Sequence, residues 1–156
     1  MTDHIAGLLG VEPAGIIYTS GASESNNLAI KGIAQASRNT GRHMISTVLE
    51  HASVGGTLTA LQQQGWEVDL LDIQRDGTID LEQLGDLLRK DTILVSVGAV
   101  DSELGTVQPI RKITEILKDF PNCRLHVDAT QAIGKTELVM DGVDTMSIAP
   151  HKFYGL

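Results

Sequence analysis

The 156-residue sequence has little of several features that mark particular classes of protein. A single cysteine, Cys123, makes an internal disulfide impossible, which fits a reducing compartment. Five aromatic residues are too few for a base-stacking surface, and a net charge of −8 without a basic patch disfavours nucleic-acid binding. No apolar run approaches the ~20 residues that span a bilayer. These absences predict a soluble, cytoplasmic protein with neither nucleic-acid nor membrane partners.

Short apolar runs alternate with longer helical stretches along the chain. Several runs are rich in Ile, Val and Leu with little polar alternation, which is typical of strands buried on both faces of a sheet. Right-handed crossovers between such strands give a parallel sheet covered by helices on both sides. We therefore expect an α/β fold of three αβα layers, with strands over 16–19, 43–48, 67–71, 92–98, 124–128 and 145–149 and helices over 3–9, 23–38, 53–64, 81–90 and 109–119.

Helix-boundary signals support this pattern. Asp80 is a candidate N-cap with Gln83 at N3, Pro109 suits a first helical turn, and Gly65 suits a helix stop. No repeat, low-complexity tract or linker interrupts the chain, so we predict one domain over residues 1–156. Because a helix begins at once and the last residues lack a closing element, we expect that domain to be truncated at both ends.

In open α/β sheets, ligands bind beyond the carboxyl ends of the strands. The segment 19–25, Thr-Ser-Gly-Ala-Ser-Glu-Ser, follows one predicted strand and opens a helix. Free backbone N–H groups and the helix dipole make such a turn a candidate anion site, with Gly21 allowing close approach. The alternative is an ordinary polar turn with serine caps, since the segment matches neither a P-loop nor a G-x-G-x-x-G or G-x-S-x-G motif.

His126 and Asp128 close a later strand, and their i, i+2 spacing points both side chains to one face. With His151 they resemble a 2-His-1-carboxylate iron site. The plainer interpretation is a strand-end aspartate that caps the next turn.

His51 and Lys152 each follow a predicted strand as well. His51 suits a ligand, a base or a flat ring stacked on a cofactor, or simply a helix start. Lys152 at an apolar strand end suits a Schiff-base lysine, although most lysines are solvated surface residues.

Two further features carry no chemistry in our interpretation. The segment 72–80 resembles the start of an EF-hand calcium loop. However, the third position is Gln74, and the twelfth is Gln83 rather than the bidentate glutamate that the motif requires. We read it as an Asp-Gly turn. Cys123 precedes a strand, at the end of the sheet away from the crevice, and we expect it to be structural rather than a nucleophile.

Taken together, these groups match what pyridoxal 5'-phosphate (PLP) requires. A helix N-terminus holds its phosphate, a flat side chain covers its ring, a carboxylate keeps the pyridine nitrogen protonated, and a lysine holds its aldehyde. An iron site would leave the lysine and the anion turn unexplained, so we predict no metal.

The sequence resembles the large domain of cysteine desulfurases, in the class V aminotransferase branch of PLP enzymes. The resemblance rests on four segments and the spacing between them, which together cover nearly the whole chain. These are Tyr-Thr-Ser-Gly-Ala-Ser-Glu-Ser-Asn-Asn at 18–27, Ile-Ser-Thr-Val-Leu-Glu-His at 45–51, His-Val-Asp-Ala-Thr-Gln at 126–131 and His-Lys-Phe-Tyr-Gly at 151–155.

The resemblance implies roles for the residues at matching positions. Lys152 would bond the cofactor aldehyde and move the substrate's α-proton, and His51 would stack on the ring and take part in proton transfer. Asp128 would pair with the pyridinium nitrogen and Gln131 with the phenolic oxygen. The remaining cofactor contacts implied are Ala22, Ser23 and His151 at the phosphate and Ser102 near the ring.

Ser23 stands where the family usually has Thr, which keeps the hydroxyl, and three further positions depart from the family pattern. Asp101 and Ser102 stand where the family usually has two asparagines, and a carboxylate there disfavours an anionic amino-acid substrate. Ala149 replaces a phosphate-binding serine, which removes a hydrogen bond worth about 1 kcal/mol.

The resemblance also implies an activity. The parent enzyme would remove sulfur from L-cysteine, leaving alanine and an enzyme persulfide that a sulfur-acceptor protein uses for iron–sulfur or thio-cofactor assembly. It would be a homodimer, and its nucleophilic cysteine would lie outside this chain, which alone is expected to be inactive. Alternatives are another class V reaction, such as that of a transaminase, lyase or selenocysteine lyase, or a non-catalytic module of the same fold.

Overall fold

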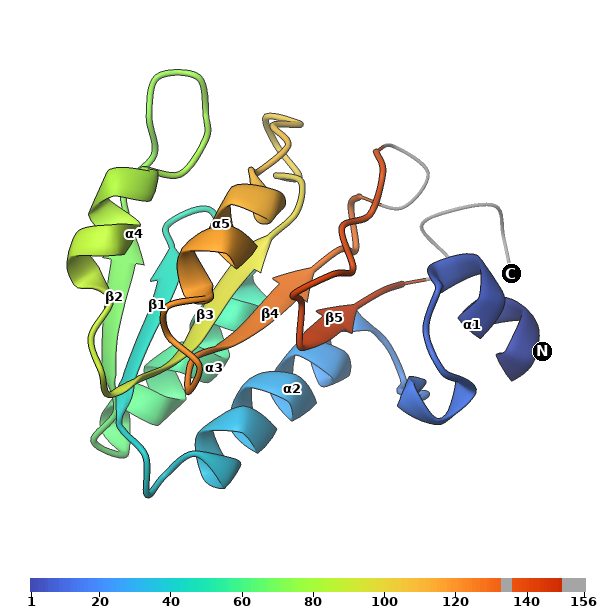
Figure 1. Ribbon diagram of the computed structural model, residues 1–156, viewed down its shortest axis with the longest axis horizontal. Coiled ribbons are helices and arrows are strands. Elements are labelled where there is room, and N and C mark those ends of the chain that lie inside the picture. The colour runs from blue at the N-terminus through green and yellow to red at the C-terminus, as the bar shows by residue number, and fades with distance from the viewer. Residues whose placement is uncertain (133–135, 150–156) are drawn as a thin grey trace.

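The computed structural model describes residues 1–132 and 136–149. Its centre is a parallel five-stranded sheet in the order β2-β1-β3-β4-β5 (Figure 1). The strands are β1 (His43–Thr47), β2 (Glu67–Leu71), β3 (Thr92–Gly98), β4 (Arg124–Asp128) and β5 (Thr145–Ser147). The predicted α/β fold with a parallel sheet is therefore confirmed.

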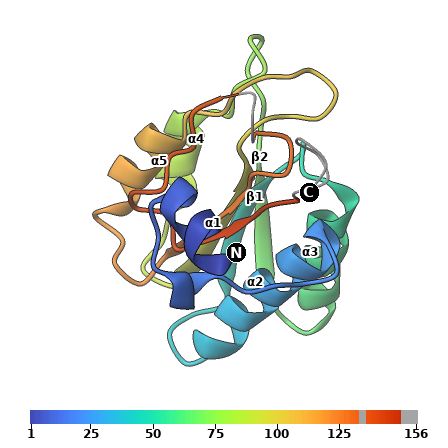
Figure 2. The ribbon, with the colours of Figure 1, turned by 90° about the vertical axis from the view of Figure 1, so that its right-hand side faces the viewer.

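Helices cover both faces of the sheet (Figures 1 and 2). One layer packs on an apolar cluster that includes Met44 and Ile93, and the other on a cluster that includes Ile45 and Val95. Neighbouring strand residues thus serve opposite faces, as strand geometry requires. The first layer consists of α2 (Ala22–Ala36) and α3 (Ala52–Gln63), and the second of α4 (Leu81–Leu87) and α5 (Ile110–Leu117).

The caps at α3 and α4 follow the sequence signals. The Asp80 carboxylate accepts a 3.1 Å bond from the Gln83 N–H, whereas the Gln83 side chain turns away to pair with Asp72. Gly65 has φ +95°, and the N–H of Trp66 bonds the carbonyl of Leu61, which ends α3 in a Schellman motif.

Several predicted elements differ from the structure in their bounds or type. Residues 16–19 are not a strand: the backbone at Ile16 is extended, but within the described residues no strand pairs with the segment. The last strand ends at Ser147, two residues early. The helices predicted over 81–90 and 109–119 are shorter, because Leu88 is already extended and Pro109 is the N-cap.

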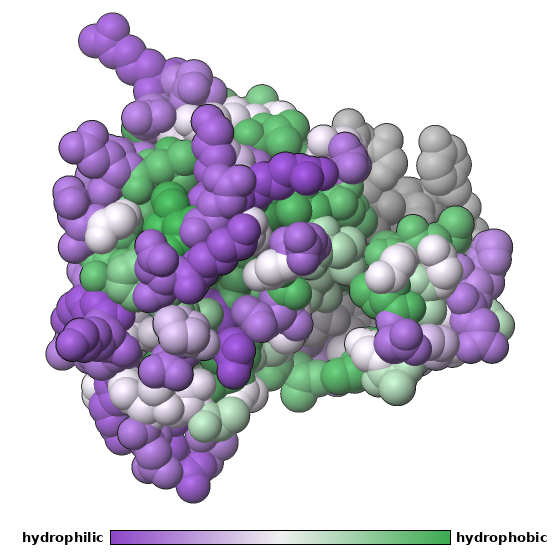
Figure 3. All heavy atoms as spheres, viewed as in Figure 1, coloured by the Kyte–Doolittle hydropathy of each residue, from purple (hydrophilic) through white to green (hydrophobic). Residues whose placement is uncertain are grey.

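The N-terminal segment lies beside the β5 end of the sheet (Figures 1 and 2). It contains α1 (Thr2–Leu9) and the short 3-10 helix η1 (Pro13–Gly15), and Thr2 bonds Tyr18 across 2.9 Å. Hydrophilic side chains cover much of the α4 and α5 layer, with hydrophobic ones between them and at α1 (Figure 3). Among the described residues, no helix is long and apolar enough to cross a membrane.

Candidate active site

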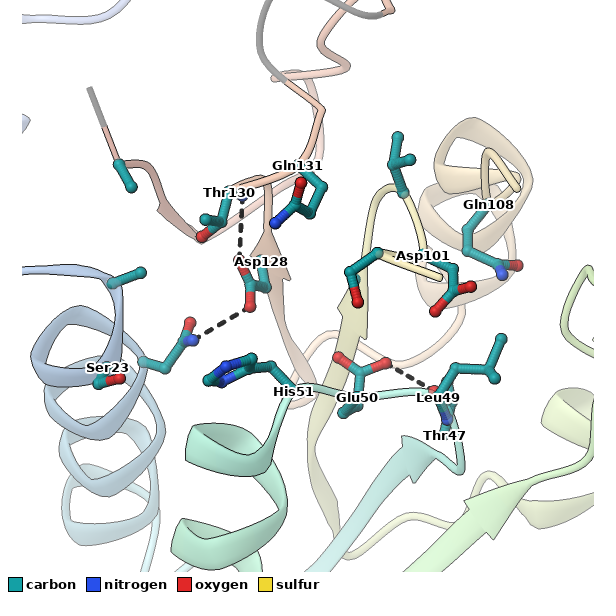
Figure 4. A pocket seen from close by; sticks show the side chains of 16 residues that line it. Ser23, Thr47, Leu49, Glu50, His51, Asp101, Gln108, Asp128, Thr130 and Gln131 are labelled. Carbon is teal, nitrogen blue, oxygen red and sulfur yellow. Dashed lines mark hydrogen bonds between the residues drawn. The ribbon is translucent and has the colours of Figure 1, made fainter. Parts of the chain in front are cut away.

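A pocket of about 240 Å³ opens where β1, β3 and β4 end and α2 begins (Figure 4). This is the edge of a parallel sheet at which α/β proteins bind ligands. All predicted site residues that the structure describes line it: Ala22, Ser23, His51, Ser102, Asp128 and Gln131. Two others, His151 and Lys152, lie outside the described residues.

The α2 N-terminus forms one wall of the pocket. Gly21 is the N-cap and no side chain caps the helix, so the serine caps of the alternative interpretation are absent. The first backbone bond of the helix runs from Ser25 to Gly21, which leaves the N–H groups of Ala22 and Ser23 without helical partners. Such free N–H groups at the positive end of a helix favour an anion.

The Thr19 hydroxyl stabilises this turn through two side-chain contacts. It donates to the Gly21 carbonyl across 3.0 Å and lies 2.7 Å from the Ser25 hydroxyl. The segment before α2 is therefore an extended arm held by side chains rather than a paired strand, yet it presents the helix N-terminus as predicted.

Asp128 ends β4 with its carboxylate in the pocket (Figure 4). Oδ1 accepts a 3.0 Å bond from the Thr130 N–H, and Oδ2 accepts a 3.1 Å bond from the Asn26 amide. Asp128 therefore both caps the following turn and faces the pocket, so the two interpretations of this residue are compatible. Two donors hold the carboxylate at a fixed place.

His51 is the N-cap of α3, and its ring lines the same pocket (Figure 4). Its Nδ1 accepts a 3.1 Å bond from the Ser53 N–H. A backbone N–H can only donate, so Nδ1 carries no proton and the proton of the ring is on Nε2. The ring is thus a neutral donor held by its own helix.

His126 and Asp128 lie on one face of β4, as their spacing predicted. Both contact the same amide, because Asn26 accepts from His126 Nε2 across 2.9 Å and donates to Asp128. The other ring nitrogen, Nδ1, lies 2.8 Å from the Thr145 hydroxyl. With both nitrogens engaged in a fully buried ring, His126 is a structural residue and is not available as an iron ligand.

Glu50 also lines the pocket, between His51 and Asp101 (Figure 4). The Thr47 hydroxyl donates to its Oε2 across 2.6 Å. Burial raises its pKa from 4.5 to about 7, and the charges of Asp128 and Asp101 act in the same direction. The pocket therefore contains a carboxyl group that titrates near neutral pH.

The turn after β3 forms another wall of the pocket, and Val100 and Val107 form an antiparallel bridge there. Asp101 lines the pocket, and its carboxylate accepts a short bond from the N–H of Leu104. The carboxylate therefore both closes the turn and places negative charge at the pocket.

The two features to which we assigned no chemistry lie as predicted. Cys123 is buried beside the first residue of β4, at the end of that strand away from the pocket, and burial raises its pKa to about 12. In the 72–80 turn, Gly77 has φ +86° and Asp76 bonds Thr78. Among the described residues, no group of acidic, histidine or cysteine side chains could hold a metal.

Sequence reasoning missed three pocket or supporting residues: Asn26, Glu50 and Ser53. Glu50 precedes His51 directly and could have been found from that neighbour. Asn26 had no such signal, because its partners Asp128 and His126 are about 100 residues away along the chain.

The chain matches the aminotransferase class-V family model over residues 1–156. It is 45% identical to the cysteine desulfurase IscS of Colwellia psychrerythraea over 98% of this chain and 38% of that protein. A solved NifS-like protein superposes with a TM-score of 0.94 at 35% identity, covering 99% of this chain and 43% of that one. The structure of SspA in complex with cysteine superposes with a TM-score of 0.91 at 37% identity, covering 99% and 45%.

The match over the whole chain defines the class: an α/β domain of the PLP-dependent aminotransferase type. The chain belongs to the class-V aminotransferase family, and its curated relatives include cysteine desulfurases, which depend on PLP. It spans 38–40% of the length of the curated relatives that it matches.

Proposed function

We propose that this chain is the PLP-binding large domain of a cysteine desulfurase, a single domain over residues 1–156. The observation that carries the proposal is the pocket itself. A helix N-terminus, the His51 ring and the Asp128 carboxylate converge on one cavity at the carboxyl ends of parallel strands. Family membership and the cysteine desulfurases among the relatives support the same assignment.

The donor set of the pocket fits PLP. The N–H groups of Ala22 and Ser23 suit the dianionic phosphate, and His151, by its place in the matching motif, would assist them. Asp128, held in place by two donors, suits the protonated ring nitrogen. Gln131 and Ser102 also line the pocket. By the resemblance, Gln131 would pair with the phenolic oxygen and Ser102 would lie near the ring.

When bound, PLP supplies an electron sink for a carbanion at the α-carbon of an amino acid. Residues of this chain would hold PLP and transfer protons next to it. His51, with its proton on Nε2, would cover one face of the ring, and Asp128 would place its carboxylate opposite the ring nitrogen. Lys152, by its place in the matching motif, would bond the cofactor and transfer the α-proton through Nζ.

The reaction of the parent enzyme would take the sulfur of L-cysteine onto an enzyme thiol, giving alanine and a persulfide. Cys123 does not suit that role, because it is buried at the far end of β4 with a raised pKa. We infer a receiving cysteine elsewhere in a homodimeric, cytoplasmic parent that passes sulfur to an acceptor protein for iron–sulfur or thio-cofactor assembly.

One observation favours a second candidate, a different class V reaction such as transamination. The Asp101 carboxylate lies in the wall of the pocket where the family usually has an asparagine. Production of sulfide and alanine from cysteine by the parent enzyme would distinguish desulfuration from the other reactions.

The experiment that tests cofactor binding is titration of the protein with PLP, followed by borohydride reduction and peptide mass mapping. We expect one pyridoxyl group per chain, on Lys152. Lys31, on the exposed side of α2, is the internal control, because a chemically unselective reaction would label it as well. Labelling spread over surface lysines, or none in the complete enzyme, would contradict the proposal.

A further inference from the structure

The amide of Asn26 joins three groups of the candidate site. Asn26 lies in the second turn of α2 and is 1% exposed. Its Nδ2 donates to Asp128 across 3.1 Å and to the Ser53 hydroxyl across 3.2 Å, while Oδ1 lies 2.9 Å from His126 Nε2. Both hydrogens of the Asn26 amide and its carbonyl oxygen therefore have partners.

We propose that Asn26 is a positioning residue, which fixes the Asp128 carboxylate for the ring nitrogen of PLP and links it through Ser53 to the His51 ring. The inference rests on the proposed function, because it takes the pocket as the PLP site. Asn26 lines the pocket, but the contacts of its amide are to protein side chains. It acts on the cofactor through Asp128 and His51.

The chemistry of the partners fixes the orientation of the amide. A charged carboxylate can only accept, so the NH₂ group of Asn26 must face Asp128. Oδ1 must then face His126, whose Nε2 therefore carries a proton. The contacts define one direction of donation that ends on Asp128.

His126 completes this chain of donors. Burial lowers its pKa from 6.5 to about 4, so the ring is neutral at physiological pH. With the proton on Nε2, the unprotonated Nδ1 accepts from the Thr145 hydroxyl 2.8 Å away. Donation thus runs from Thr145 on β5 through His126 and Asn26 to the Asp128 carboxylate, from the sheet edge to the pocket.

The second Asn26 hydrogen reaches the other side of the pocket. It bonds the Ser53 hydroxyl, which lies 2.9 Å from His51 Nδ1, the same nitrogen that accepts from the Ser53 N–H. The carboxylate for the ring nitrogen and the imidazole for the ring face are therefore held by one amide. Loss of that amide would loosen both at once, leaving Asp128 with its bond from the Thr130 N–H and His51 with its bond from the Ser53 N–H.

The test compares Asn26→Ala with Ala34→Gly, a buried change two turns further along α2 that touches neither Asp128 nor His51. Both variants should lower the unfolding midpoint. The dissociation constant for PLP should rise about tenfold in N26A alone. The ¹⁵N resonance of ¹⁵N-labelled PLP should also shift toward the unprotonated ring nitrogen in N26A and remain unchanged in A34G.

Equal effects of the two variants on PLP binding would reduce Asn26 to a structural residue and overturn the inference, as would wild-type binding by N26A. A second measurement needs no variant. The ¹⁵N shifts of His126 in the cofactor-free protein should show the Nε2–H form, and an Nδ1–H form would refute the amide orientation. If the unaltered protein takes up no PLP, the proposed function fails, while the His126 measurement still decides the network.

Discussion

At the scale of single residues, Asp101 sets the charge of the pocket on the side away from α2. It faces the cavity near Glu50 and Asp128, so three carboxyl groups share one small space. An anionic substrate carboxylate would meet repulsion there, and a conservative change to asparagine removes the Asp101 charge. An asparagine would still accept from the Leu104 N–H and keep the turn closed.

We therefore predict that Asp101→Asn strengthens binding of an amino-acid carboxylate. The dissociation constant for L-alanine, measured by spectral titration of the PLP-loaded protein, should fall about three- to tenfold, less at high salt. Asp86→Asn removes the same charge from the exposed face of α4 and should leave the constant unchanged. Equal binding by D101N and the wild type would show that the Asp101 charge does not reach the ligand.

The same scale shows what sequence can and cannot reveal about a site. His51, Asp128 and Gln131 were predictable because a polar residue at the carboxyl end of a buried strand has a defined place in a parallel sheet. Asn26 was not, because an asparagine inside a helix has no local signal of burial. Its role depends on a strand about 100 residues later in the chain.

At the scale of elements, short apolar runs predicted the bounds of several strands correctly. The bounds predicted for 67–71, 92–98 and 124–128 match β2, β3 and β4. The run at 16–19 looked the same locally, but a strand needs a neighbour, and Ile17 there is 70% exposed. Pairing is a property of the sheet, so composition alone cannot distinguish a strand from an extended arm.

The connection from α2 to β1 depends on the small size of Gly41. A Cβ at this position would overlap the backbone of Asp91, which cannot move aside as a flexible side chain could. We predict that Gly41→Ala lowers the free energy of unfolding by about 2–3 kcal/mol, as steric conflict in a packed interior does.

The matched control for that change is Gly32→Ala inside α2, where a Cβ meets nothing within 4 Å. Because alanine favours helix over glycine, G32A should raise the free energy of unfolding by about 0.5–1 kcal/mol. Urea denaturation of both variants measures the pair, and equal effects in either direction would mean that Asp91 does not constrain the connection.

At the scale of the whole molecule, two buried groups link stability to pH in opposite directions. Glu50 has a raised pKa of about 7, so its contribution to stability is complete below pH 4.5 and is lost as the pH rises through 7. His126 has a lowered pKa of about 4, so its contribution is complete above pH 6.5 and is lost as the pH falls through 4. Between pH 4.5 and 6.5 the two slopes oppose each other.

Substitution of Glu50 by glutamine would separate these two effects. Glutamine has nearly the same shape but no proton to lose, so E50Q keeps only the His126 slope in this range. The free energy of unfolding of E50Q relative to the wild type should therefore increase from pH 4.5 to 7.5, by on the order of 3 kcal/mol. Denaturant curves at intervals of half a pH unit would measure the difference. A difference that stays constant with pH would mean that Glu50 ionises in the folded protein at its ordinary pKa, and that the pocket is more hydrated than the burial of its carboxyl group implies.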